Sequence, residues 1–315
     1  MNFSEPPKIR SQGGIALMTV MLVLSVVTVV LVAMSSDRQM DIRRTENQLR
    51  TIQAWEYVYG LEAWAAKQLK IDTTNNLYDD LFDKWNKPLT STPIPEGNIQ
   101  AEIVDLQGRL NVNNLLVDGE ASEEDILRLK RLLIILKINT DLVDVMLDWI
   151  DADMDLRTPN SAEDETYSKF TPPYRSANGP FSDVSELVRL KGMTLKDYKK
   201  LLPYIYVADE RTPVNINTAS AVVLRTFAPD ITKNQAESLY NASGKPFKDI
   251  EEFFKDEAME GIVINKESIG VASHHFLLSG QIDMGKNVLI FDSQLNRNDL
   301  GEVKVVKRLR KGVNE

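Results

Sequence analysis

A continuous apolar segment from Ile15 to Ser36 constrains this chain more than any other feature. It reads IALMTVMLVLSVVTVVLVAMSS and contains no charged side chain. A helix rises about 1.5 Å per residue, so about 20 residues cross the hydrocarbon layer of a bilayer, and a lipid-embedded segment must be helical to satisfy its backbone. The segment is longer than the roughly 7–15 apolar residues of a secretory signal, and no small-x-small cleavage pattern follows it. The sequence therefore predicts a transmembrane helix over residues 15–36.

Residues 1–14 form a short polar leader. Pro6 and Pro7 exclude a regular helix there, and Gly13-Gly14 gives a flexible join to the apolar segment. Such a join suits cleavage by a protease at a membrane surface, and it equally suits an ordinary polar tail. Charge counting does not decide the membrane orientation, because basic residues lie on both flanks of the apolar segment.

The chain is acidic and has no cysteine. The formal net charge is −9 over 315 residues. The lack of cysteine excludes disulfides and thiolate metal sites, but it does not place the protein in a reducing compartment. An acidic body is a poor partner for nucleic acid and is repelled by anionic lipid headgroups.

The helix is expected to continue beyond the membrane. No proline interrupts residues 15–70, which as one helix measure about 84 Å. Spacings of three and four place one apolar stripe on a buried face. Trp55 and Trp64 are predicted as core residues. The stripe comprises Ile42, Leu49, Ile52, Trp55, Tyr59, Ala63, Ala66 and Leu69.

An antiparallel sheet is predicted on both sides of a long helical region. Residues 86–98 hold three prolines and a glycine and are expected to be a loop. Alternating or apolar runs predict strands, and the sequence between them predicts helices over 110–270. This arrangement is an α+β plan. The expected strands are 98–105, 273–283, 287–293 and 301–309.

The helical region contains a partial internal repeat. Residues 214–219 (VNINTA) echo 110–115 (LNVNNL), and 247–253 (FKDIEEF) echo 181–187 (FSDVSEL). Two copies predict two small units of helix-hairpin-helix or SAM-like type, with the asparagines capping helices and turns. DNA-binding hairpins need a glycine-rich turn that reaches a phosphate. The turn at 227–231 (FAPDI) has no glycine and carries an acid, so we expect it to pack against protein.

An acidic loop follows the helix predicted over residues 140–150. Its many carboxylates repel one another unless a cation lies among them, and oxygen donors on a flexible loop suit calcium. A solvated acidic loop is the alternative. An EF-hand pattern starting at Asp151 fails, because Leu156 takes the glycine position and Ala162 the glutamate position. A catalytic set is not apparent, since the two histidines, His274 and His275, are adjacent on a predicted strand. The carboxylates are Asp144, Asp148, Asp151, Asp153, Asp155, Glu163, Asp164 and Glu165.

Several of these motifs together resemble one family. A leader ending in Gly14, followed by Ile15-Ala-Leu-Met-Thr19, is similar to a type IV pilin-like signal, although most such proteins carry a glutamate where this chain has Thr19. Its absence is typical of one branch, minor pseudopilin K of type II secretion (the GspK family). The further matching segments are residues 44–55, 148–153 (DWIDAD), 162–167 and 172–178, and the resemblance covers nearly the whole chain.

The resemblance implies a pilin-like long N-terminal helix packed on an antiparallel sheet, with a large helical domain inserted. It implies that a prepilin peptidase cuts after Gly14, so that the mature chain begins at N-methylated Ile15. The protein would be anchored in the inner membrane with its C-terminal body in the periplasm. The expected parts are a leader (1–14), a transmembrane segment (15–36), a pilin-like domain (37–109 and 273–315) and helical subdomains at 110–207 and 208–272.

The resemblance also implies a function without catalysis. The protein would be a minor pseudopilin that caps the pseudopilus tip and helps to start its assembly, for export of folded periplasmic proteins. Its partners would be minor pseudopilins I and J and the major pseudopilin, with no nucleic acid. A membrane-anchored, helix-hairpin-helix DNA-binding competence protein is the alternative, and an acidic-loop hydrolase is a third reading. Proteins of the family bind calcium in the acidic region, which implies as ligands Asp151, Asp153, Asp155, Glu163 and Asp164.

Overall fold

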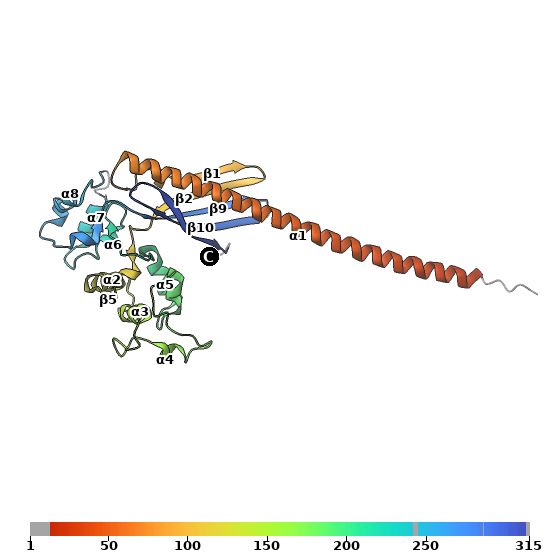
Figure 1. Cartoon of the computed structure of the whole chain (residues 1–315), viewed down its shortest axis with the longest axis horizontal. Coiled ribbons are helices and arrows are strands. Elements are labelled where there is room, and N and C mark those ends of the chain that lie inside the picture. Colours follow the sequence, from red (N-terminus) through yellow and green to blue (C-terminus); the bar gives the residue numbers. More distant parts are fainter. Residues whose placement is uncertain (1–12, 242–244, 286, 313–315) are drawn as a thin grey trace, which may run out of the picture.

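A long helix, a five-stranded sheet and a helical insertion make up the described chain. The computed structural model describes residues 13–241, 245–285 and 287–312, so most of the predicted leader lies outside the described residues. Figure 1 shows helix α1 (Gly13–Asn75) running along the sheet and projecting far beyond it, while the helical insertion hangs from the opposite end of the sheet. This is the α+β, pilin-like plan that the sequence predicts.

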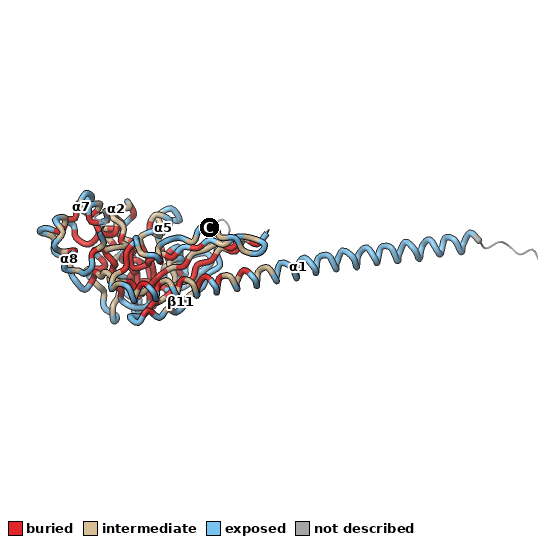
Figure 2. Tube along the Cα trace, turned by 90° about the horizontal axis from the view of Figure 1, so that it is seen from above, coloured by how far each residue is buried: buried red, intermediate tan, exposed pale blue. Residues whose placement is uncertain are grey.

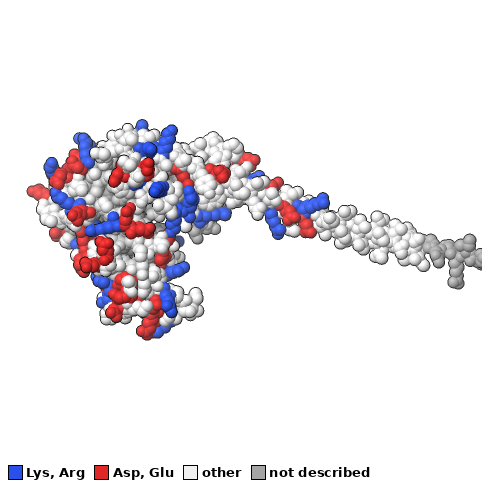
Figure 3. Space-filling view, in the orientation of Figure 1, with Lys and Arg blue, Asp and Glu red and all other residues white. Residues whose placement is uncertain are grey.

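The first half of α1 is not packed against the other residues that the structure describes. Its residues are exposed, and Figure 3 shows a rod without charge followed by a short band of mixed charge. Its hydroxyl groups bond back to the helix itself; the Thr19 Oγ1, for example, donates to the Ala16 carbonyl oxygen at 2.9 Å. Among the described residues, one helix is long and apolar enough to cross a membrane, and it is α1. The predicted membrane segment therefore lies within a single unbroken helix.

The second half of α1 packs on the sheet through a different stripe from the one predicted. The residues buried there are Ala54, Val58, Leu61, Ala65 and Leu69. Of the predicted stripe, Leu69 is buried and Trp55 is half-buried; Trp64, predicted separately as a core residue, is half-buried against the same core. The other large residues of that stripe are exposed. The exposed side chains are Ile42, Leu49, Ile52 and Tyr59.

All five strands of the main sheet are antiparallel, in the order β1-β2-β9-β10-β11. The helical insertion leaves from the end of β2 and returns at the start of β9, and these two strands are neighbours. Figure 2 shows the first half of α1 exposed and buried segments throughout the head. The strands are β1 (Leu89–Ile94), β2 (Gly97–Asp105), β9 (His275–Met284), β10 (Asn287–Arg297) and β11 (Val303–Lys311).

The prediction of a loop over 86–98 is wrong in part, because β1 occupies residues 89–94 and β2 begins at Gly97. Pro93 is tolerated because β1 is an edge strand, where a missing backbone N–H costs no ladder bond. The pairing with β2 also shifts register between Leu89 and Thr92. Pro95 and Glu96 then form the turn, with Glu96 in the left-handed region (φ 67°). A short 3-10 helix, η1 (Lys84–Asn86), precedes the strand.

A buried carboxylate fastens α1 to the sheet. Glu62 accepts a hydrogen bond from the Ser293 hydroxyl on β10 at 2.6 Å. The guanidinium of Arg308 on β11 donates to both Glu62 oxygens, at 2.7 and 2.8 Å. Bidentate pairs of this kind fix orientation as well as contributing energy. The helix is therefore held in one register on the sheet.

The helical insertion consists of two units with the same plan. Each begins with a two-residue strand and ends with another that pairs with it in parallel: β3 (Leu110–Asn111) with β6 (Ile205–Tyr206), and β7 (Val214–Asn215) with β8 (Ile269–Gly270). The first unit also contains a small hairpin, β4 (Leu116–Val117) and β5 (Glu120–Ala121). Its helices are η2 (Val112–Leu115), α2 (Glu123–Leu136), α3 (Leu142–Ile150), α4 (Asp164–Tyr167), η3 (Val184–Arg189), α5 (Leu195–Leu201) and η4 (Leu202–Tyr204). Those of the second are α6 (Ala221–Leu224), α7 (Lys233–Asn241), α8 (Ile250–Phe254), η5 (Glu257–Met259) and η6 (Lys266–Ser268).

The sequence repeat corresponds to a repeated hydrogen-bond pattern. The Asn113 side chain donates to the Phe181 carbonyl oxygen and accepts from its N–H, at 3.0 and 2.9 Å. Asn217 makes the same two bonds with Phe247, both at 2.9 Å. In both units an amide at the start of the repeat thus holds the phenylalanine of the F-x-D motif. The aspartates of that motif cap helices: Asp183 caps η3 and Asp249 caps α8.

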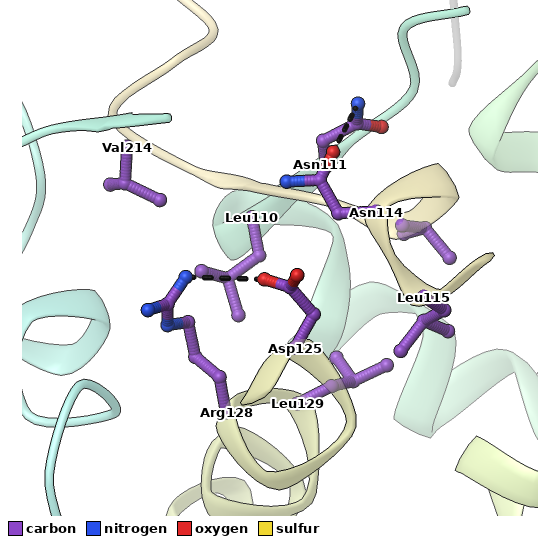
Figure 4. Close-up of a pocket in the computed structure, with 9 residues that line it drawn as sticks. Leu110, Asn111, Asn114, Leu115, Asp125, Arg128, Leu129 and Val214 are labelled. Atoms are coloured by element: carbon purple, nitrogen blue, oxygen red, sulfur yellow. Dashed lines mark hydrogen bonds and ion pairs between the residues drawn. The ribbon is translucent and has the colours of Figure 1, made fainter. Parts of the chain in front are cut away.

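The two units share one hydrophobic core, which runs from Leu110 to Ile269. A small pocket lies at their junction, and its lining includes Leu110 and Val214, the first residues of the two units (Figure 4). The buried Arg128 of α2 forms ion pairs there with Asp125 and Glu124, at 3.2 and 2.7 Å. Its guanidinium also lies over the Phe227 ring. The pocket is therefore a packed junction whose charges pair with one another.

Candidate metal site

The acidic loop joins the end of α3 to α4. Asp148 belongs to α3 and Asp151 caps its C-terminus, so the regular helix fixes both carboxylates. Glu163 stands at the N-cap position of α4. The three side chains are buried. Figure 3 shows carboxylates at the end of the insertion where α4 lies in Figure 1.

Buried oxygens in this region lack hydrogen-bond donors. The Asp148 Oδ2, Asp151 Oδ1 and Glu163 Oε1 atoms have no partner among the described residues, and neither has the Asn178 Oδ1. Buried polar atoms are normally bonded, so each unpaired one needs an explanation. Four acceptor oxygens without donors in one region fit a bound cation.

The acid–base equilibria of these groups point the same way. Burial, together with the charges of Asp148 and Asp151 and against the hydrogen bond from Ser176, raises the pKa of Glu163 to about 7. Burial also raises the pKa of Asp151 to about 6, with Asp153 and Asp148 adding to the effect. Burial likewise raises the pKa of Asp148. Unpaired negative charge in a low-dielectric region causes these shifts, and a cation would reverse them.

The remaining predicted ligands are placed differently. Asp153 and Asp155 are exposed, and together with Asp144 and Asp151 they line an open groove. The Asp164 Oδ1 accepts from the Ser176 backbone N–H and hydroxyl, at 2.9 and 2.8 Å. Asp164 is therefore partly satisfied by protein donors. The structure thus separates the predicted set into buried, groove-lining and hydrogen-bonded members.

Sequence reasoning left Asp148 and Asn178 out of the predicted ligand set. Asp148 lies three residues before Asp151 on a helix, which was the available signal, but helical spacing alone does not reveal complete burial. Among the described residues, one group of three carboxylates has oxygens within 4.8 Å of one another, and it lies elsewhere, at Asp72, Asp79 and Asp83.

The two histidines and the turn at 227–231 have structural roles. His275 is buried and His274 half-exposed, as strand alternation predicts. The turn predicted to pack against protein does so, since Phe227 and Ala228 are buried in the core. Arg131 of α2 donates to the carbonyl oxygens of Thr226 and Phe227, at 2.9 and 3.2 Å.

Comparison with known proteins decides the family. Models of type II secretion system protein K match residues 108–210 and 214–272. The protein K of Pseudomonas aeruginosa is 33% identical over 95% of this chain and 93% of its own length. The chain belongs to the type II secretion system protein K family. Other members are the proteins K of Klebsiella pneumoniae, 29% identical over 87% of this chain and 89% of theirs, and of Aeromonas hydrophila, 32% identical over 67% and 69%.

The fold agrees with a solved structure. A chain in the GspK–GspI–GspJ complex from the enterotoxigenic Escherichia coli type 2 secretion system matches with a TM-score of 0.77. The match covers 85% of this chain and 99% of that chain at 23% identity, so the likeness is one of fold. The family predicted from the leader junction and the acidic motifs is therefore confirmed: the chain is a minor pseudopilin of the protein K family.

Proposed function

We propose that this minor pseudopilin caps the tip of the pseudopilus and helps to start its assembly, without catalysing a reaction. The observation that carries the proposal is the insertion at the end of the sheet away from the rod (Figure 1). A filament packs identical heads closely around its axis, and a head carrying two additional helical units has no room to repeat there. The end of the filament offers that room.

The rod has the features of a terminal subunit. In pilin-like filaments a carboxylate near the start of the helix faces the N-terminal amine of a neighbouring subunit. Here that position is Thr19, whose hydroxyl bonds to its own helix. A subunit at the tip has no further subunit beyond it, so it does not need the carboxylate. Cleavage after Gly14 would free Ile15 as the mature N-terminus, in the inner membrane, with the head in the periplasm.

The partners we propose are the minor pseudopilins I and J and the major pseudopilin. The exposed apolar side chains of Ile42, Leu49, Ile52 and Tyr59 offer a stripe for neighbouring helices. They recur at intervals of three and seven residues, a spacing found in helix-packing seams. A chain of the solved complex with GspI and GspJ shares this fold, which supports the same assembly here.

We propose that the acidic loop binds calcium. Asp148, Asp151 and Glu163 would supply buried oxygens, with Asp153, Asp155 and Asp164 as the further predicted ligands. The unpaired oxygens and raised pKa values fit a hard, oxygen-preferring cation. When bound, the ion would neutralise mutual repulsion and hold the α3–α4 loop in one conformation.

A DNA-binding role is the weaker candidate. The turn at 227–231 buries its apolar side chains and engages Arg131 through its carbonyl groups, so its backbone serves packing. We expect no gel shift with double-stranded DNA at moderate salt.

The deciding experiment examines the protein from its native host. Mass spectrometry should find an N-terminus at methylated Ile15, and affinity purification of the full chain in detergent should recover minor pseudopilins I and J. Thr19→Glu should leave secretion largely intact. An unprocessed leader, or a chain recovered without any other pseudopilin, would contradict the proposal; loss of secretion in Thr19→Glu would count against the tip position.

A further inference from the structure

A second carboxylate group lies at the end of α1, outside the acidic loop. Asp72 is in the last turn of the helix, and Asp79 and Asp83 are in the segment that follows. One oxygen of each lies within 4.8 Å of the others. Asp72 and Asp79 are buried and Asp83 is half-buried. These separations are those of donors around one cation, since Ca²⁺–oxygen distances are about 2.3–2.6 Å.

The charges in this group do not balance. Arg297 at the end of β10 is the basic side chain that contacts them, through Asp79 Oδ2 and, at 3.5 Å, Asp72 Oδ2. Its guanidinium also donates to the carbonyl oxygens of Leu69 and Ser273. Three carboxylates against one guanidinium leave an excess of two negative charges when all are ionised. Burial, followed by the charges of Asp83 and Asp79, accordingly raises the pKa of Asp72.

An independent observation points to a ligand. The Asp79 carboxylate is completely buried, and its Oδ1 accepts no hydrogen bond from any residue that the structure describes. Its Oδ2 is fully used, by Arg297 and by the Ser273 N–H at 2.7 Å. The Asn76 Oδ1 is likewise buried without a partner, while its Nδ2 donates to Asp83 Oδ1 at 3.4 Å. Two buried acceptor oxygens of this group, Asp79 Oδ1 and Asn76 Oδ1, thus lack a positively charged partner among the described residues.

We propose that Asp72, Asp79 and Asp83 bind one divalent cation, with the Asn76 side-chain oxygen as a fourth donor. The donors are all oxygens, which favours a hard cation. They come from a helix end and an irregular segment, and calcium accepts such geometry more readily than magnesium, which demands a near-ideal octahedron.

The position gives the ion a structural role. The Asp79 backbone N–H donates to the Val271 carbonyl oxygen at 2.8 Å, and its carbonyl accepts from Asn215 Nδ2 at 3.1 Å. Asn215 belongs to β7 and Val271 directly follows β8, the paired short strands of the second helical unit. A cation here would therefore tie the end of the rod to the sheet and to the insertion, and would set the angle at which the insertion is held.

The test must separate this site from the acidic loop. We would use the full chain in detergent with the loop disabled by Asp151→Asn and Glu163→Gln, and measure bound ⁴⁵Ca²⁺ by equilibrium dialysis. This background should still bind one calcium ion per chain. Adding Asp72→Asn should weaken that binding at least tenfold, whereas Asp197→Asn, at a half-buried carboxylate on α5, should leave it unchanged. Asparagine at 72 keeps the shape of a side chain whose charge is already disfavoured, so this variant should fold.

Terbium luminescence gives a second readout that does not depend on stoichiometry. The Trp85 Nε1 donates to Asp83 Oδ2 at 3.2 Å, so excitation of Trp85 should sensitise Tb³⁺ at this site. The emission should saturate in the loop-disabled background, fall with added calcium more than with magnesium, and weaken with Asp72→Asn. A background that binds no calcium, or calcium binding unaffected by Asp72→Asn in a folded chain, would overturn the proposal. Either result leaves the tip assignment standing, because that rests on processing and partners.

Discussion

Replacing Asn113 by alanine should destabilise the helical insertion by about 3 kcal/mol. The Asn113 amide serves the Phe181 N–H and carbonyl and also donates to the Ala208 carbonyl at 3.0 Å, all in buried surroundings. Ala208 keeps a bond from Asn111 at 3.3 Å, whereas both Phe181 groups lose their side-chain partner. Each buried group left unpaired costs about 1–3 kcal/mol, which gives the total.

The second unit provides a matched comparison. Asn217→Ala removes the equivalent two bonds to Phe247, but these are partly buried and water can replace them. The net loss should be about 1 kcal/mol. Asn160→Ala, which removes one exposed bond to Asp141, should cost under about 0.5 kcal/mol.

The assay is urea denaturation of the full chain in detergent, followed by near-ultraviolet circular dichroism. Trp149 stacks 6.5 Å from the Phe181 ring and packs against Tyr167, so this aromatic signal reports the region that Asn113 anchors. If Asn113→Ala unfolds at the same urea concentration as Asn160→Ala, the buried Asn113 amide does not stabilise the insertion as proposed, and the argument from unpaired buried groups is wrong.

Three further predictions concern other parts of the molecule. Glu62→Ala should destabilise the α1–sheet contact by about 2 kcal/mol in thermal unfolding, a value that is reduced because Arg308 is partly exposed. Glu56→Ala, at an exposed position, should have little effect. Equal effects of the two variants would contradict the role given to the Glu62–Arg308 pair. Burial lowers the pKa of His275 against the opposing charge of Glu210, so stability should fall with acidification below about pH 6.5, by at most ~1.4 kcal/mol per pH unit, and this dependence should disappear in His275→Gln. Millimolar calcium should raise the Tm of the full chain, because calcium at 100 times its Kd adds about 2.7 kcal/mol to the free energy of unfolding. The double variant Asp148→Asn with Glu163→Gln should show a smaller rise in Tm. A wild-type Tm that calcium leaves unchanged would contradict the calcium proposal.

The broad architecture was predictable because its signals are local. An uncharged run, a proline-free continuation and alternating strands near the C-terminus require no tertiary information. Edge strand β1 was missed because Pro93 within it and Pro88 and Pro95 beside it indicate a loop, and only its place at the sheet edge makes Pro93 acceptable. The buried stripe of α1 was misplaced because spacing along the helix does not show which face meets the sheet, and the face that does so carries Ala54, Val58, Leu61, Ala65 and Leu69.

The site was harder to predict than the fold. The sequence repeat was visible, but the Phe181 and Phe247 backbone groups that its asparagines bind lie 68 and 30 residues away. The acidic loop was found from charge density, yet burial distinguishes Asp148, Asp151 and Glu163 from their exposed neighbours, and burial depends on the packed core. Asp72, Asp79 and Asp83 attracted no attention because they are spread over a helix end and an irregular segment.

The route of the chain through the sheet has a mechanical consequence. Asp105 at the end of β2 lies opposite Phe276 in β9, so the insertion emerges and returns at one edge of the head through two adjacent strands. A pull on the insertion would draw both strands lengthwise past β1 and β10. Their hydrogen bonds would then bear the load together, in shear, instead of opening one after another. A head built in this way can carry a lengthwise pull between the insertion and the sheet without its strands separating one bond at a time.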